Sequence, residues 1–190
     1  MKPTLILLTL MAFGQASAQM DHSMHSQQAM QMQMGSTMDM GGLMKLSGKN
    51  FDRAFISMMI PHHQEAVDMA KAVLPKSKDP QVKKWANDII TAQQKEIKEM
   101  QALLKTLGGN DSKMAKMMMS GMQGMTDMVK GAKDADTAFV KGMLPHHASA
   151  IHMANMALEK SENRTVLNLA RDIVVAQAGE MHAFKMWLLK

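Results

Sequence analysis

Apolar residues in the last three quarters of the chain follow the period of an α-helix rather than the alternation of a strand. One face of the first such segment collects Phe55, Met59, Ala66, Ala70 and Val73. Leu74-Pro75 predicts the end of this helix, because the residue before a proline is driven out of helical geometry. Asp79-Pro80 predicts the start of the next helix, as an N-cap followed by proline at the first helical position. The pattern therefore predicts long helices joined by short turns.

An internal repeat organises these helices. A shift of 84 residues superimposes residues 55–104 on residues 139–188 without a gap, and Pro61-His62-His63 falls on Pro145-His146-His147. One helical hairpin cannot bury its own apolar face, so two hairpins predict an all-α, four-helix bundle with a long crossover. The expected segments are a bundle at 48–190, with repeat 1 at about 50–107, a Met-rich crossover at 108–136 and repeat 2 at about 137–190.

Residues 1–18 have the features of a secretory signal peptide. Lys2 supplies a positive charge, Leu5 to Phe13 a short apolar run, and Ala16-Ser17-Ala18 a small-residue cleavage site. The apolar run is about half the ~20 residues that a spanning helix needs, and no later segment qualifies. We therefore expect a periplasmic or secreted protein without stable membrane insertion, cleaved near Ala18. The alternative is an uncleaved membrane anchor.

Residues 19–47 are predicted to form a disordered arm. They consist largely of Met, Gln, Ser, Gly, Asp and His, with no branched aliphatic side chain before Leu43, so they cannot build a core. Candidate metal ligands in the arm are Met20, His22, Met24 and His25. Sacrificial oxidation of methionine and plain drift of a linker sequence are the alternatives.

Composition restricts the chemistry further. The chain has 26 methionines among 190 residues and no cysteine, which excludes disulfides, a thiolate metal site and a cysteine nucleophile. The net charge is +5, but the lysines are scattered, so nothing favours nucleic acid as a partner. Thioether sulfur is a soft ligand that selects Cu(I), and by the same logic Ag(I), over Zn, Mg or Ca, while imidazole also accepts Cu(II). Copper ions, chiefly Cu(I), are therefore the expected ligand.

Polar side chains are directed into the predicted bundle. On a helical wheel His62 and His63 flank Met59, which lies three and four residues before them. Gln93 and Glu96 interrupt the apolar face of the next helix, and the second repeat has the same arrangement. Such residues could form a hydrogen-bonded polar layer that fixes helix register, or a metal site of His nitrogen and Met sulfur with Glu or Gln as ligand or orienting group. Two His pairs, each beside methionine, favour the metal site.

The run from Met58 to Ala70, with the later Gln93-x-x-Glu96-Ile97-x-x-x-Met100, resembles the family known as domain of unknown function 305. The pattern recurs as Met143-Leu144-Pro145-His146-His147 and Gln177-x-x-Glu180-Met181. The resemblance implies a ferritin-like four-helix bundle, exported, of a kind found among copper-binding and copper-resistance proteins. The metal-associated positions that it implies are Met59, His62, His63, Met69, Glu96, Met143, His146, His147, Met153 and Glu180.

The second repeat departs from the first at two places. Ala148-Ser149 stands where the first repeat has Gln64-Glu65, and Phe184 stands in place of Met100. These differences predict a second site with fewer ligands. The remaining histidines, His152 and His182, lie opposite the apolar faces of their helices and are expected on the surface.

Three functions are compatible with these observations. The first is an exported protein that sequesters or carries copper, with other copper-handling proteins as further partners, and not an enzyme. The second is a ferritin-like di-metal oxidase, although the Glu-x-x-His pairs of carboxylate-bridged di-iron bundles are absent from the sequence. The third is a metal-free structural or partner-binding bundle with an adaptable methionine surface. The oligomeric state is not predicted.

Overall fold

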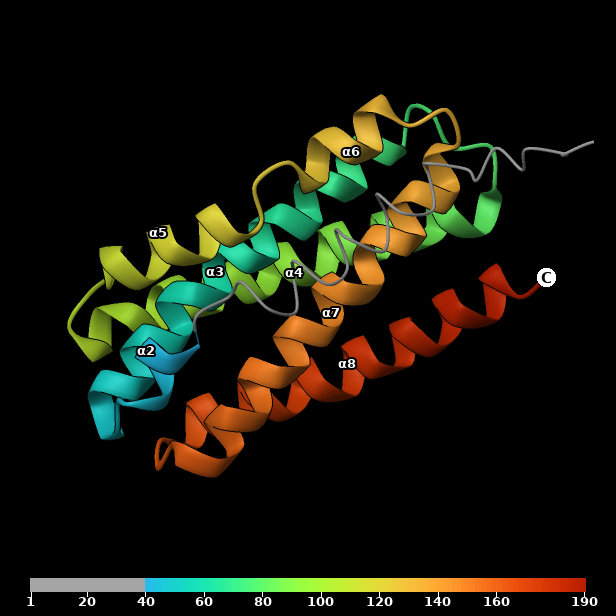
Figure 1. Ribbon diagram of the computed structural model, residues 1–190. Coiled ribbons are helices and arrows are strands. Elements are labelled where there is room, and N and C mark those ends of the chain that lie inside the picture. Colours follow the sequence, from blue (N-terminus) through green and yellow to red (C-terminus); the bar gives the residue numbers. More distant parts are fainter. Residues whose placement is uncertain (1–39) are drawn as a thin grey trace, which may run out of the picture.

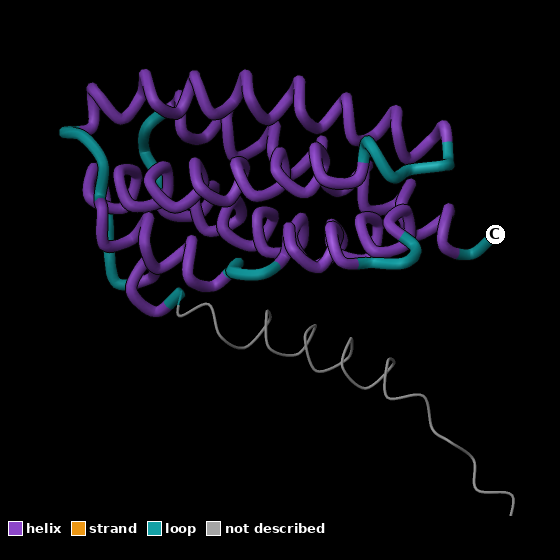
Figure 2. Tube along the Cα trace, turned by 90° about the horizontal axis from the view of Figure 1, so that it is seen from above, coloured by secondary structure: helices purple, strands orange, loops and turns teal. Residues whose placement is uncertain are grey.

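The computed structural model describes residues 40–190, and every regular element in this part of the chain is an α-helix (Figure 2). In chain order the helices are α2 (Gly41–Met44), α3 (Gly48–Val73), α4 (Pro80–Leu107), α5 (Ser112–Gly121), α6 (Met125–Gly131), α7 (Ala135–Lys160) and α8 (Arg164–Leu188). The four long helices form two hairpins, α3–α4 and α7–α8, and the hairpins pack together through α3 and α7 (Figure 1). The predicted four-helix bundle is confirmed.

The helix ends are set by the side chains that the sequence indicates. The Asp79 carboxylate accepts hydrogen bonds from the backbone N–H of Gln81 and Val82 at the start of α4. In the second hairpin Asn163, at the same repeat position, accepts from Thr165 and Val166 at the start of α8. These bonds satisfy backbone donors that a helix start leaves without a partner. The second helix of each hairpin is therefore capped at its start in the same way.

The Met-rich crossover is helical and lies on the bundle. The sequence left open whether residues 112–130 form a helix on the bundle or a loop; they form α5 and α6, which run along α3 in Figure 1. Four of the crossover methionines are buried in this contact, Met114, Met118, Met122 and Met125. The crossover thus adds a second apolar layer outside the four-helix core.

This layer changes the surroundings of α3. The wheel predicts one buried face, whereas Ala54 and Ser57, on the opposite side of the helix, are also buried. Ser57 is covered because α5 packs on this side of α3, which a bare four-helix bundle would leave in water, and the N-cap of α5, Asp111, donates its backbone N–H to the Ser57 hydroxyl. The first half of α3 is therefore a central helix, enclosed on nearly every side.

The last part of the predicted arm contains a short helix that packs on the bundle. The arm is expected to extend to residue 47, but Gly41–Met44 forms α2, with Leu43 fully buried against the core. The carbonyl of Met44 accepts a hydrogen bond of 2.7 Å from Nζ of Lys160 on α7. Leu43 is the first branched aliphatic residue after Ala18, and its burial fastens α2 to the bundle. The predicted signal peptide and most of the arm lie outside the described residues.

None of the described helices combines the length and apolarity that crossing a bilayer would require.

Candidate metal centre

Each histidine pair follows a proline inside a long helix, Pro61 in α3 and Pro145 in α7. A proline has no N–H to donate to the carbonyl four residues before it, so it weakens the helix at that point. Beside the first proline, the hydroxyl of Ser57 accepts a 2.8 Å hydrogen bond from the backbone N–H of Asp111, which caps α5. The crossover is thus fastened to α3 one turn before the first histidine pair.

His62 and His146 meet at the contact between the two hairpins. Their ring centroids are 3.8 Å apart, with 36° between the ring planes, and both side chains are fully buried. Nε2 of His146 donates to the backbone carbonyl of His62 at 3.0 Å. Nε2 of His62 lies 2.7 Å from the hydroxyl oxygen of Ser149, which itself donates to the carbonyl of His146. Repeat-related histidines therefore contact each other at the centre of the bundle.

The second histidine of each pair binds a glutamate on the neighbouring helix. Nε2 of His63 lies 2.7 Å from Oε2 of Glu96 on α4, and Nε2 of His147 lies 2.6 Å from Oε2 of Glu180 on α8. Both imidazoles are fully buried, whereas the two carboxylates keep 21% and 27% of their side-chain surface exposed. The predicted inward direction of these four residues is confirmed, and each hairpin contains one His–Glu pair.

These hydrogen bonds assign the tautomer of every neutral imidazole in the centre. A carbonyl or carboxylate oxygen can only accept, so Nε2 of His146, His63 and His147 carries the hydrogen. The Ser149 hydroxyl uses its single hydrogen on a carbonyl, so Nε2 of His62 must also donate. Each Nδ1 then holds a lone pair, and none of the four buried Nδ1 atoms has a hydrogen-bond partner in the protein.

A buried acceptor without a partner costs about 1–3 kcal/mol, so four of them call for an explanation. The same pattern extends to Gln93 and Gln177, whose buried Oε1 atoms also lack partners, at equivalent positions of the two repeats. Neutral imidazole with a free lone pair is a form that binds transition metals. The donor set in the bundle therefore fits a metal that takes nitrogen ligands.

Burial keeps the central pair of imidazoles neutral. The pKa of His62 is held well below 6.5, first by loss of solvation and then by repulsion from a protonated His146, His63 or His147. The pKa of His146 is lowered in the same way, by burial and then by His147 and His63. Both rings thus keep their lone pairs at neutral pH and below it.

The predicted methionines are in the same core, but only one of them is brought to a defined neighbour. Met59, Met143, Met69 and Met153 are all fully buried. A Cβ atom built on Gly142 would lie 3.7 Å from Sδ of Met69, which places this sulfur against α7. Histidine contacts histidine and glutamate directly, whereas the methionines surround them as part of the apolar core.

Some candidates do not join the centre. His152 and His182 are on the surface, as expected from the wheel, although Met156, one turn after His152, is buried. Within residues 40–190, no three His, Asp or Glu side chains are grouped as a cluster that could hold a metal ion. The arm candidates Met20, His22, Met24 and His25 lie outside the described residues.

A family model described as "Domain of unknown function (DUF305)" matches the chain twice, over residues 7–104 and 104–188. The protein belongs to the DUF305 family. The two matches agree with the two hairpins of the structure, one match to each repeat.

Solved structures of related proteins have the same fold. CopM in its Cu(I)-bound form is 34% identical, with 72% of this DUF305 chain and 94% of CopM covered and a TM-score of 0.60. The Cu(II)-bound form of CopM gives 33% identity, coverage of 72% and 95%, and a TM-score of 0.62. A DUF305 fragment from Deinococcus radiodurans is 28% identical, with coverage of 72% and 94% and a TM-score of 0.62.

A curated relative, "Uncharacterized protein L153" of Acanthamoeba polyphaga mimivirus, is 45% identical over 53 residues. The matched segment covers 28% of this DUF305 chain and 35% of the viral protein, so the chain spans about a third of that relative's length.

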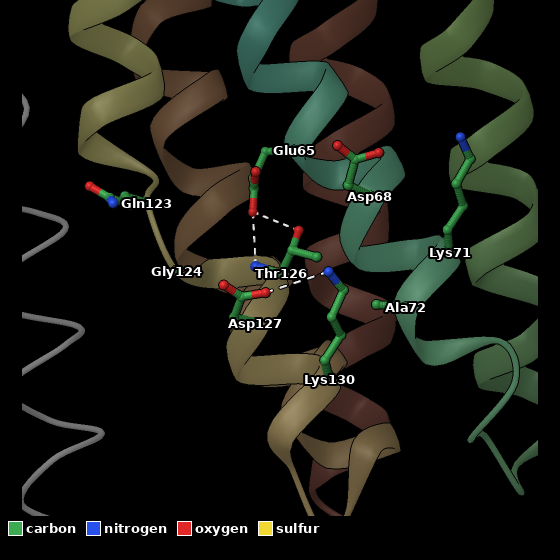
Figure 3. A pocket seen from close by; sticks show the side chains of 9 residues that line it. All are labelled: Glu65, Asp68, Lys71, Ala72, Gln123, Gly124, Thr126, Asp127 and Lys130. Carbon is green, nitrogen blue, oxygen red and sulfur yellow. Dashed lines mark hydrogen bonds and ion pairs between the residues drawn. The ribbon is translucent and has the colours of Figure 1, made fainter.

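Sequence reasoning missed the roles of Glu65 and Ser149, which occupy equivalent positions in the two repeats. Ser149 joins the central hydrogen bonds of His62 and His146. Glu65 instead turns outward, and its Oε1 accepts from the backbone N–H of Thr126 at 2.9 Å and from its hydroxyl at 2.7 Å (Figure 3). The difference between Glu65 and Ser149 at this repeat position was the sequence signal that could have revealed their roles. It marks a position that serves the centre in one repeat and anchors the crossover in the other.

The outward carboxylate of Glu65 borders an open pocket of about 540 Å³ between α3 and α6. Figure 3 shows Asp127 on its far side, paired with Lys130 at 3.4 Å. Four of the charged groups drawn there, Glu65, Asp68, Asp127 and Lys130, already bind neighbours in the same surface, so this pocket adds nothing to the buried centre.

Proposed function

We propose that this protein binds copper in its helical bundle, and that it sequesters or carries the metal outside the cytoplasm instead of catalysing a reaction. The observation that carries the proposal is the set of four buried imidazoles whose Nδ1 lone pairs have no partner in the protein. Fully buried methionine sulfur in the same core supplies the soft ligand that favours Cu(I). Solved structures of CopM with Cu(I), Cu(II) and Ag support copper and silver as the ions to test.

The two hairpins offer related but unequal sets of ligands. Each provides His63 or His147, held at Nε2 by a glutamate that orients the ring and leaves Nδ1 free. A carboxylate that accepts from the far nitrogen of a metal-bound imidazole raises the basicity of the ligand. We therefore assign Glu96 and Glu180 as orienting groups, with imidazole nitrogen and methionine sulfur as the ligands.

Acid should weaken copper binding less than the pKa of an unperturbed histidine would suggest. Protonation removes a nitrogen ligand, and an unperturbed histidine is half protonated at a pH of about 6.5. Because the pKa values of His62 and His146 are lowered, these two rings stay neutral below that pH. Thioethers carry no proton at all, so Cu(I) binding should persist in mild acid.

An anaerobic Cu(I) titration of the mature chain against a chromogenic chelator tests the proposal. A variant with His62, His63, His146 and His147 all changed to Gln should lose most of the affinity. In the matched control, the exposed histidines His152 and His182 are changed to Gln instead. This control should bind Cu(I) as the wild type does. Circular dichroism checks that both variants remain helical.

No competition with the chelator by the wild-type chain would overturn the proposal and favour the metal-free bundle. Equal loss of affinity in the control would show that the exposed histidines carry the binding. Rapid consumption of oxygen by the Cu(I)-loaded protein would instead favour the oxidase alternative.

A further inference from the structure

The residue Gly142 on α7 interrupts the likeness between the repeats, because its equivalent in the first repeat is Met58. The absence of a side chain at Gly142 leaves room that another residue takes. A Cβ atom built there would lie 2.9 Å from the terminal methyl carbon of Met128, which is closer than real Cβ atoms approach other atoms. Met128 comes from α6 in the crossover, outside both repeats.

The same point of α7 is also in contact with Met69 of α3, whose Sδ lies 3.7 Å from the built Cβ. Two thioether side chains, from α3 and from α6, thus end against one position of a third helix. Met69 is fully buried and Met128 is half-buried, so the contact lies at the edge of the core.

The place of this contact relates it to the central histidines. Gly142 lies one helical turn before His146, and Met69 lies two turns after His62, on the same faces of their helices. The methionine contact is therefore the layer next to the stacked His62 and His146. The repeat relation makes Met153 and Met58 the equivalents of Met69 and Gly142, and both of these methionines are buried.

We propose that Met69 and Met128, brought together over Gly142, form a thioether site for one soft monovalent cation, Cu(I) or Ag(I). Met128 then supplies the second sulfur that the chain lacks at position 142, where the first repeat has Met58. Soft thioether sulfur without a competing proton is the ligand type that these ions prefer. The inference rests on the proposed function, since it names a ligand for the same cargo from outside the repeated motif.

The anchoring of α6 supports a defined position for Met128. Glu65 of α3 holds the first turn of α6 through two hydrogen bonds to Thr126, drawn as dashed lines in Figure 3. At the other end of α6, Nζ of Lys76 donates to the carbonyl of Lys130. Met128 lies between these two anchors, so α6 presents the end of its side chain to α7 at a fixed place.

The test is an Ag(I) titration of the mature chain labelled with ¹³C at the methionine methyl groups. Silver is used because it does not oxidise methionine, and the Met69 and Met128 signals are assigned from the spectra of M69L and M128L. Both signals should shift in the same titration step. M128L should lose one equivalent of Ag(I), while M119L, a change at an exposed methionine of the same crossover, should keep it.

Leucine fills a similar apolar volume, so M128L preserves packing and removes only the sulfur. A third variant, G142A, tests the site without removing either sulfur. The new methyl group occupies the place of the Met128 methyl, which must move away. G142A should therefore stay helical, since alanine favours a helix over glycine, yet lose the same equivalent of Ag(I).

If the wild type binds Ag(I) while the Met128 signal stays in place, or if M128L binds as many ions as the wild type, the thioether site is wrong and the proposed function stands. If the wild type binds neither Ag(I) nor Cu(I), the proposed function fails, and this inference with it.

Discussion

At the scale of single residues, the histidine triplets contain two different kinds of imidazole. His63 and His147 each bind a glutamate that reaches toward solvent, whereas His62 and His146 contact each other and are hydrogen-bonded only to uncharged groups. The first kind has a carboxylate that fixes the ring through Nε2. The second kind has none and is enclosed by burial, so its chemistry depends on staying neutral.

The stability of the fold should therefore depend on the central pair below pH 6.5. The pKa values of His62 and His146 are lowered from 6.5 in the folded state, so the unfolded chain binds more protons below that pH. Stability should then fall as the pH drops from about 6.5 toward the folded-state values, by up to ~1.4 kcal/mol per pH unit for each ring. Urea denaturation of the metal-free protein between pH 7.5 and pH 5 measures this slope.

The H62Q/H146Q double variant is the control, and its stability should vary less over the same range. The lowered pKa values of Asp79 and Asp134, due first to hydrogen bonds from Trp187 and Thr137, act in a separate window below their ordinary value of 3.8. A wild-type stability that stays level or increases toward pH 5 would contradict the assignment of a neutral, buried pair.

Ser149 has a measurable role in the centre. In S149A, Nε2–H of His62 loses its acceptor while the ring stays buried. The expected cost is about 1–3 kcal/mol in the free energy of unfolding, because a buried donor without a partner keeps its full desolvation penalty. Urea denaturation compares S149A with S120A, an exposed serine of α5 whose change should be nearly neutral. Equal stability of the two variants would show that His62 finds another acceptor.

At the scale of helices, the sequence predicts where the helices end, but not which of their faces the crossover buries. Pro75, Asp79 and Asn163 act over a few residues, so the sequence alone locates the boundaries of α3, α4 and α8. The path of the crossover depends on long-range packing against α3. Glycines at 121 and 124 fit a loop as well as a break between two helices, and only the burial of four methionines in the contact decides.

The two equivalent N-caps should contribute unequally to stability. Replacing either cap by alanine removes an acceptor for the first turn, which costs about 0.5–2 kcal/mol in a typical helix. D79A should cost more than N163A, because Asp79 also accepts from Nε1 of Trp187 at 2.8 Å and so joins α4 to α8. Chemical denaturation measures both, with exposed D88A as the control on α4.

Equal effects of D79A and N163A would show that the Trp187 contact adds nothing to stability. A large effect of D88A would show that loss of an acidic side chain on α4, rather than loss of the cap, is being measured.

At the scale of the whole molecule, the repeat was the strongest predictor. It fixed the number of long helices, the pairing of α3 with α4 and of α7 with α8, and the inward direction of the histidines and glutamates. The repeat could not predict which equivalent positions have different roles in the two hairpins. Ser149, Glu65 and Gly142 became informative only when the fold showed what lies beside each of them.

Export is a prediction for the whole chain that the sequence makes and the described residues do not test. When the full-length chain is expressed in a Gram-negative host, the periplasmic fraction should contain a protein that begins at Gln19, because cleavage after Ala18 is expected. N-terminal sequencing and intact mass measure this. A control variant with Ala16 and Ala18 changed to Arg should remain uncleaved. Finding the wild type uncleaved in the membrane fraction would favour the alternative of an N-terminal anchor.

The central claim is that imidazole Nδ1 atoms in the bundle bind copper while Nε2 keeps its hydrogen. The most direct test is ¹⁵N NMR of the histidine rings during titration of the mature chain with Ag(I), a diamagnetic substitute for Cu(I). The Nδ1 signals of buried histidines should shift as the metal binds, the Nε2–H signals should remain, and exposed His152 and His182 should not respond first. Binding that shifts Nε2, or that leaves all four buried rings unchanged, would contradict this account.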